Sequence, residues 1–395
     1  MKTTYPYERV QLFSGGGSRF GYYLGSYAAL VEHDLKPDLI IGTCGGSLSA
    51  LLVQLAPDPI ALKQLIESQA LYKAIGNIIH VPPSEVSTRH KWRYASQAFN
   101  RWRTSHLGTR QSANTHADLL EELQQLAMFR IENDNQWLNA LIHLANANEQ
   151  TAIAPMSPDI AIIASRFYQG QTAQVARCQP QLQEVLFAPP PLAHRYQTQL
   201  IPSSTTDPTA GSTSHKLISP ANTLARTRIH QKVAVLQEWD IATAVRASMS
   251  DMYYLPPIYI QELGWCLGGV INLTPIELAA AAGKIVFAET KAEYDRWLAA
   301  PAIRHVFGFD PNERLAQVHQ YQHEDIANGF ASQIHWLPFA DNAAQLGGQQ
   351  VRKRLNIKTT MMELVHSSHD TFVRQMHAQW DYGYKRTVSY IQQNF

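Results

Sequence analysis

The chain of 395 residues has few cysteines and no long apolar run. Cys44, Cys178 and Cys266 are too few and too widely spaced for a disulfide framework or a metal site, so we predict no bound metal. A transmembrane helix needs about 18 or more consecutive apolar residues, and no such run occurs. The first residues also lack the apolar stretch of a signal peptide. We therefore expect a cytoplasmic protein.

Charge of one sign is not in excess either. The sequence has 33 Lys and Arg against 32 Asp and Glu, which gives a formal net charge of +1. We expect no nucleic-acid partner from such a balance. With 45% hydrophobic residues and no internal repeat, the chain can bury a sizeable core, and its length predicts one large globular domain or two.

Acidic residues are missing from one stretch, between Glu85 and Asp118, whereas basic residues are frequent in residues 89–110. Aromatic residues recur there at spacings of three and four, which predicts a helix over Trp92–His106 with an aromatic face and cationic flanks. Such a helix suits peripheral contact with an anionic membrane. The alternative is a helix that packs its aromatic face on the main domain and leaves its arginines in water.

The stretch from Arg9 to Ala56 contains two strand–loop–helix units in succession. Its apolar pattern predicts strands over Arg9–Phe13 and Asp38–Ile41, and helices over Arg19–His33 and Ser47–Leu55. Such an order forms a parallel βαβα unit, in which both loops lie at the carboxyl ends of the strands. A functional site is therefore predicted at that edge of the sheet.

Gly15, Gly16 and Gly17 form the first of these loops. Consecutive glycines before a helix let backbone N–H groups converge on one point, where the helix dipole also favours negative charge. Such a loop binds a phosphate or stabilises an oxyanion. The dinucleotide pattern G-x-G-x-x-G is broken by Phe20, and no P-loop lysine or ribose-binding acid follows. We therefore expect no cofactor.

The second loop, residues 42–46, has the glycine spacing of a G-x-S-x-G nucleophile elbow, with Cys44 at the position of the serine. An elbow holds its central side chain out of the sheet, at the start of the next helix. We expect the dipole of that helix to lower the pKa of the thiol and to favour nucleophilic attack. An apolar pocket wall would raise the same pKa, and which effect dominates depends on solvent access. Ser47 is an alternative nucleophile, but it lies a helical turn too late, so we interpret it as a first-turn helix residue.

Three motifs follow one another in a fixed order. Gly15–Arg19 is a glycine loop with a basic residue, Asp38–Leu48 contains the elbow, and Leu267–Gly269 ends in two glycines near a strand end. In these motifs the sequence resembles the patatin-like phospholipase family, over roughly residues 8–56 and 158–290. The resemblance implies an α/β fold with a mainly parallel central sheet flanked by helices and with inserted helical or lid segments.

Two residues depart from the family pattern. Cys44 stands where the family has its serine, and Leu267 stands where it has the aspartate of the catalytic dyad. A leucine cannot accept the proton that the nucleophile must lose. Asp251 lies in a loop that the resemblance implies is near the pocket, and it is the best substitute carboxylate; the alternative is that it serves as a turn residue.

The resemblance further implies an oxyanion site in which N–H groups of Gly16, Gly17 and Gly45 converge. Gly15 and Arg19 belong to the same loop, and Arg19 would steady it or receive an anionic head group. Three functional hypotheses remain, of which a nucleotide-binding protein that uses Gly15–Gly17 is the weakest. The first is an acyl hydrolase or acyltransferase that uses Cys44 on a fatty-acyl ester or thioester. The second is a catalytically silent protein that binds an acyl chain, a lipid or a protein partner.

We predict a patatin-like α/β domain over residues 1–290, with a helical insertion at about 58–150 and a Pro/Ser/Thr-rich loop at about 187–221. Residues 291–395 are predicted to form a mixed or helical extension that packs on the same domain. Apolar periodicity predicts further strands over Asp159–Ser165, Lys232–Leu236 and Lys284–Ala288, and helices over Asp58–Ala74, Asp118–Asn148, Ile241–Ser248, Ile276–Ala282 and Thr359–Gln393.

Overall fold

The structure is a computed structural model. It describes residues 5–15, 17–80, 116–125, 127–131, 134–143, 157–168, 181–196, 217–297, 299–321, 324–325, 330–356, 361–365 and 367–395. Outside the described residues lie the predicted helix over Trp92–His106, Gly16, Cys178 and much of the Pro/Ser/Thr-rich stretch. Membrane contact by that helix therefore stays a prediction. Within the described ranges, no helix is both long and apolar enough to span a bilayer.

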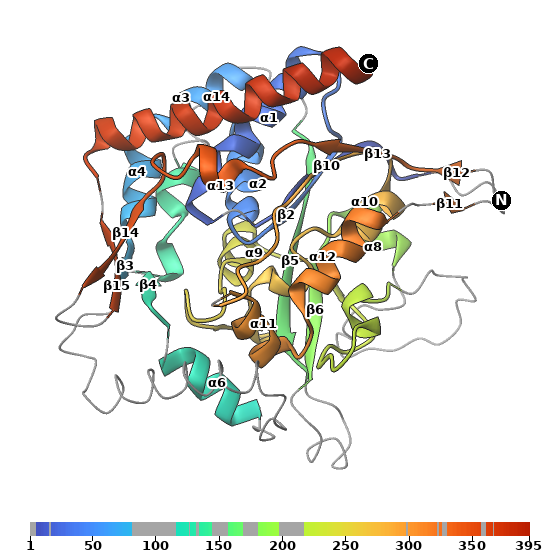
Figure 1. Cartoon of the computed structure of the whole chain (residues 1–395), viewed down its shortest axis with the longest axis vertical. Helices are drawn as coiled ribbons and strands as arrows, with labels where there is room; N and C mark the ends of the chain where they lie inside the picture. The colour runs from blue at the N-terminus through green and yellow to red at the C-terminus, as the bar shows by residue number, and fades with distance from the viewer. Residues whose placement is uncertain are drawn as a thin grey trace.

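A mainly parallel sheet forms the centre of the fold (Figure 1). Its strands are β1 Tyr7–Phe13, β2 Leu39–Thr43, β5 Asp159–Phe167, β6 Leu182–Phe187, β7 Ala234–Leu236, β8 Ile258–Ile260, β9 Gly264–Leu267, β10 Gly283–Glu289 and β13 Gln333–Leu337. The order is β13-β10-β1-β2-β5-β6-β7, with β9 on β5 and β8 on β9. Neighbours from β13 to β5 are parallel, as are β6 and β7, whereas β6 and β9 run antiparallel to β5. The predicted α/β class is confirmed.

Helices cover both faces of this sheet. One face carries α1 Gly21–Glu32, α2 Gly45–Leu55, α9 Ile241–Ser248 and α14 His369–Asn394, and the other carries α8 Pro190–Arg195, α10 Ile276–Ala282 and α12 Pro311–Gln320. Side chains alternate between the two resulting cores along each strand, since Ile40 enters the first while Leu39 and Ile41 enter the second. The sheet is therefore buried on both sides, as its near-continuous apolar strands predict.

Shorter elements surround this core. They are α3 Pro59–Ile66, α4 Gln69–Gly76, α6 His116–Gln125, α11 Ala299–Phe307 and α13 Asn342–Gln345, with the strand pairs β3 Ile78–His80 and β4 Phe129–Ile131, β11 Glu324–Asp325 and β12 Phe330–Ala331, and β14 Arg352–Asn356 and β15 Met361–Val365.

The predicted bounds of two long helices before β5 are wrong. The segment predicted as one helix over Asp58–Ala74 forms two helices, α3 and α4. Helix α3 ends at Ile66, and Ser68 caps the start of α4, because its Oγ accepts the N–H of Leu71. The helix predicted over Asp118–Asn148 ends at Gln125 as α6, since the chain then forms β4 and pairs with β3. Tertiary strand pairing outweighs helical periodicity at this position.

Two other predictions are wrong in part. The stretch predicted as a loop over residues 187–221 contains the short helix α8, which starts with prolines at positions that tolerate the missing N–H. The helix predicted over Thr359–Gln393 begins ten residues later, at His369, where Ser368 caps it, and β15 precedes it.

The C-terminal helix α14 lies along α1 (Figure 1, red at the top). The two backbones approach so closely that only glycine fits at two positions. A Cβ added at Gly25 would lie 2.0 Å from the carbonyl oxygen of Trp380, and one at Gly383 would lie 1.9 Å from that of Tyr22. Helix α14 therefore packs directly on the helix that follows the glycine loop.

Candidate active site

Cys44 lies at a strained turn between β2 and α2, with φ 50° and ψ −124°. A positive φ is costly for a residue with a side chain, so surrounding contacts must hold it. The N–H of Cys44 donates to Ser248 Oγ at 2.8 Å, and Ser248 Oγ donates to the carbonyl of Ile163 at 2.6 Å. On the other side, Ser47 Oγ, in the first turn of α2, donates to the carbonyl of Cys44 at 2.6 Å.

The glycine loop lies against this elbow. A Cβ added at Gly45 would lie 2.7 Å from the carbonyl oxygen of Gly17, and one at Gly15 would lie 3.2 Å from Cβ of Cys44. Gly46 has similarly little room, since its added Cβ would be 1.9 Å from the carbonyl oxygen of Phe13 at the end of β1. These glycines allow the backbones of the two loops to touch. The structure therefore brings Gly15, Gly17 and Gly45 together beside Cys44.

Asp251 places a carboxylate in contact with the thiol. Cys44 Sγ donates to Asp251 Oδ2 at 3.9 Å, a long but acceptable distance for sulfur. Asp251 belongs to the turn after α9, and Gly268 packs on that turn: an added Cβ there would lie 3.0 Å from Cα of Asp251, and its N–H donates to the carbonyl of Ser250. Asp251 thus lies beside the Leu267–Gly269 segment, where the resemblance implies an aspartate.

Leu267, at the family's aspartate position, has an apolar environment. It is 1% exposed, pairs with Ser165 across β9 and β5, and belongs to a buried cluster with Phe167 and Val270. Burial in such a cluster favours an uncharged side chain over a carboxylate. The acid position of the family is therefore part of the core in this chain.

Burial raises the pKa of the Cys44 thiol well above its ordinary value, and the negative charge of Asp251 raises it further. The N–H of Gly45 and the positive charge of Lys291 act in the opposite direction but do not compensate. Of the two opposing effects expected on the thiol pKa, desolvation therefore outweighs the first-turn amide of the helix. At neutral pH the sulfur carries its proton, and attack requires a base.

Lys291 is a site residue that the sequence did not reveal. Its Nζ donates to the carbonyl of Gly15 at 2.6 Å and lies 3.2 Å from Glu289 Oε1. Lys291 stands two residues beyond β10, the strand next to β1. The carboxyl ends of neighbouring parallel strands meet at one edge, which is the signal that could have identified it.

Two tyrosines also belong to the surroundings of the thiol. The pKa of both Tyr254 and Tyr294 is raised, mainly by burial, and the negative charges of Cys44 and Asp251 add to the shift. Both phenols therefore remain neutral and add aromatic surface near the reacting atoms. Tyr254 lies three residues after Asp251, in the loop that the resemblance placed near the pocket, whereas Tyr294 lies outside every motif.

Arg19 lies in the short turn Gly17–Arg19 that links the loop to α1. Its Nε is buried and makes no hydrogen bond within the described part of the chain, while its charge lowers the pKa of Tyr22 slightly against a larger effect of burial. Cys266 is buried, and desolvation raises its pKa to about 12, so it is a structural cysteine of the core.

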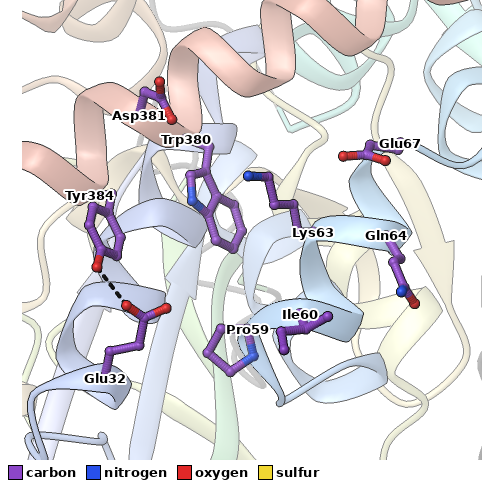
Figure 2. A pocket seen from close by; sticks show the side chains of 9 residues that line it. All are labelled: Glu32, Pro59, Ile60, Lys63, Gln64, Glu67, Trp380, Asp381 and Tyr384. Carbon is purple, nitrogen blue, oxygen red and sulfur yellow. Dashed lines mark hydrogen bonds between the residues drawn. The ribbon is translucent and has the colours of Figure 1, made fainter.

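A separate groove lies between α1, α3 and α14. Its volume is about 380 Å³, and Figure 2 shows Trp380 of α14 reaching down into it. The lining residues are Glu32, Pro59, Ile60, Lys63, Gln64, Glu67, Trp380, Asp381 and Tyr384. Neither the thiol nor the glycine loop contributes to this lining, so the groove is distinct from the candidate active site.

An α/β sheet with a strained strand-to-helix elbow against a glycine loop defines the nucleophile-elbow class of proteins. The model of the family described as patatin-like phospholipase matches residues 12–280. This match spans more than half of the chain, and the protein belongs to that family.

Individual relatives are similar over shorter stretches. A patatin-like phospholipase domain-containing protein of Pyricularia oryzae is 44% identical over 63 residues, 16% of this chain and 8% of that protein. One of Aspergillus clavatus is 40% identical over 68 residues, 17% and 9% of the respective chains. The chain thus aligns with less than a tenth of these curated relatives. The crystal structure of VipD from Legionella pneumophila is 11% identical, with 98% of this chain and 67% of that chain covered and a TM-score of 0.30; a likeness at that score carries no argument.

Proposed function

We propose that the protein is an acyl hydrolase or acyltransferase that cleaves a fatty-acyl ester or thioester through Cys44. The observation that carries this proposal is the hydrogen bond from Cys44 Sγ to Asp251 Oδ2 at an elbow that faces the glycine loop. Membership of the patatin-like phospholipase family supports a lipid ester as the substrate class.

In the proposed reaction, the sulfur of Cys44 attacks the acyl carbonyl carbon while its proton passes to Asp251 Oδ2. Backbone N–H groups of Gly17 and Gly45 stabilise the resulting oxyanion. The tetrahedral intermediate collapses, the carbon–oxygen or carbon–sulfur bond to the leaving group breaks, and the leaving group takes the proton from Asp251. A thioester on Cys44 remains.

The second half repeats these steps in reverse. The oxygen of water, or of an acceptor hydroxyl, attacks the thioester carbonyl carbon, and Asp251 accepts the proton that this oxygen loses. The carbon–sulfur bond breaks, and the sulfur of Cys44 recovers the proton. Water as the nucleophile gives a free fatty acid, whereas an acceptor alcohol gives a new ester.

The raised thiol pKa supports a second candidate, a silent protein that binds an acyl chain or a partner. A neutral, partly buried thiol reacts slowly unless a base is aligned during attack. The catalytic proposal rests on Asp251 filling that role, and so the two candidates differ in whether an acyl-enzyme forms.

Intact-mass spectrometry distinguishes them. The wild-type protein, mixed with a long-chain p-nitrophenyl ester or acyl-CoA, should gain the mass of one acyl group, and peptide mapping should place it on Cys44. Cys44→Ala should show neither adduct nor turnover, while Cys266→Ala serves as the matched cysteine control and keeps both. Turnover that persists in Cys44→Ala, or no adduct with any donor, would rule the cysteine enzyme out.

A further inference from the structure

Lys291 is anchored at one end of the glycine loop. Its side chain is 12% exposed, its Nζ donates to the carbonyl of Gly15 at 2.6 Å, and Glu289 Oε1 lies 3.2 Å away. Glu289 is 1% exposed and also accepts hydrogen bonds from Tyr22 at 2.6 Å and Tyr23 at 2.5 Å. A buried charge pair with this many partners is held in one geometry, so the Gly15 carbonyl is fixed as well.

Gln379 of α14 is anchored at the other end. It is 1% exposed, its Oε1 accepts the N–H of Gly21 at 2.9 Å, and its Nε2 donates to the carbonyls of Ser18 at 3.2 Å and Gln349 at 2.5 Å. Helix α1 begins after Phe20 without a side-chain cap of its own. Gln379 therefore satisfies a first-turn amide that would otherwise lack a partner.

We propose that Lys291 and Gln379 are positioning residues that hold the two ends of the glycine loop for the reaction at Cys44. The bound carbonyls of Gly15 and Ser18 lie on either side of Gly17 in the chain, so the two contacts together restrict the orientation of the Gly17 amide, the proposed oxyanion donor. Oxyanion donors are effective only when they are aimed before the reaction begins. This inference rests on the proposed function.

Both residues lie beyond residue 280, where the family match ends. The C-terminal segment is thereby assigned a part in catalysis, since it binds the loop on which oxyanion stabilisation depends. Packing of α14 on α1 requires only that the helix be present. The hydrogen bonds of Gln379 require in addition that this one position carry a side chain with both a donor and an acceptor.

The test measures kcat and KM for a p-nitrophenyl ester in two variants. Gln379→Met removes the amide at similar volume. Lys291→Met is combined with Glu289→Gln, because removal of the lysine alone would leave a buried unpaired charge that can unfold the protein. We expect kcat to fall about 10- to 100-fold, somewhat less than the loss of a complete oxyanion donor, with KM changed less than about twofold. Lys291→Arg, which keeps the charge and the donors, should retain more activity than the double variant.

Matched controls remove contacts that do not touch the loop. Tyr384→Phe eliminates the hydrogen bond between Tyr384 and Glu32, another link between α14 and α1 that Figure 2 shows as a dashed line. Lys284 stands on the same strand as Glu289, and Lys284→Met eliminates its exposed ion pair with Glu8. Both controls should keep kcat. Equal losses in controls and test variants, or full kcat in folded Gln379→Met and in the double variant, would overturn the proposal.

Hydrogen exchange of the peptide that spans residues 17–24 separates this inference from the proposed function. Exchange should be faster in Gln379→Met and in the double variant than in the wild type, because the loop amides lose their anchors. A wild-type protein without an acyl adduct on Cys44 would refute the proposed function, and the exchange data would still decide the loop anchors. Unchanged exchange in both variants would overturn them.

Discussion

Replacement of Asp251 by asparagine should change the thiol and the turnover in opposite directions. The variant keeps the size of the side chain and removes both the base and its negative charge. Because the charge of Asp251 contributes to the raised thiol pKa, its loss should lower that pKa and make Cys44 ionise more readily. Loss of the base should nevertheless slow acylation, since no group then accepts the proton during attack.

The magnitudes follow from the geometry. Unit charges separated by the 3.9 Å between Cys44 Sγ and Asp251 Oδ2 interact by about 4 kcal/mol at an effective dielectric constant of about 20. A third of that energy already changes the thiolate fraction about tenfold, since about 1.4 kcal/mol corresponds to one pKa unit. Removal of a general base costs about 10²- to 10⁴-fold in rate.

Two assays measure these effects on the same protein. Alkylation of Cys44 by iodoacetamide, followed by peptide mass spectrometry across pH, should show a midpoint at lower pH in Asp251→Asn than in the wild type. Steady-state hydrolysis of a p-nitrophenyl ester should fall at least about 100-fold. The reasoning fails if hydrolysis is unchanged, or if the alkylation midpoint moves to higher pH. Glu262→Gln, which changes an exposed carboxylate on the turn between β8 and β9, is the matched control and should leave both unchanged.

Two further predictions concern the loop and the pH dependence of stability. Gly45→Ala should lower turnover at least about tenfold, because its Cβ would lie 2.7 Å from the Gly17 carbonyl oxygen and displace the oxyanion loop. The control Gly76→Ala should be neutral, since no neighbouring residue that the structure describes lies within 4 Å of the added Cβ. Equal activities of the two variants would contradict this prediction. The free energy of unfolding should decline as pH rises above about 8.5, because the buried thiol of Cys266, whose pKa is raised to about 12, keeps a proton that the unfolded chain loses. In urea titrations, Cys266→Ala should therefore make the decline between about pH 8.5 and 10 shallower. An equal slope in that variant would exclude Cys266 as a contributor.

The first βαβα unit could be predicted from sequence because its signals are local. The apolar runs of β1 and β2 and the glycines at Gly15 and Gly45 act within a few residues, and the structure places these elements within two residues of the expected bounds. Asp251 could be proposed as the substitute carboxylate because the resemblance located its loop near the pocket. Its role in catalysis stays a proposal.

What the sequence missed depends on distant packing. The sign of the Cys44 pKa shift is set by desolvation, which arises from how the surrounding elements pack rather than from the helix that follows. Lys291 and Gln379 reach Gly15, Ser18 and Gly21 across more than 270 residues, and neither stands in a recognisable motif. Helical periodicity likewise could not reveal that β4 would pair with β3.

The two departures from the family pattern are geometrically consistent with each other. In the proposed mechanism, a carboxylate on the turn after α9 takes the role of the one that the resemblance implies on the Leu267–Gly269 segment, and Gly268 keeps those two segments in contact. Oxygen-to-oxygen hydrogen bonds span about 2.5–3.0 Å, so a serine hydroxyl, on a shorter bond than sulfur, would fall short of a carboxylate that lies 3.9 Å from the thiol. The larger atom at Cys44 spans that distance, and in the proposed mechanism its lower intrinsic pKa than a hydroxyl reduces what Asp251 must accomplish as a base.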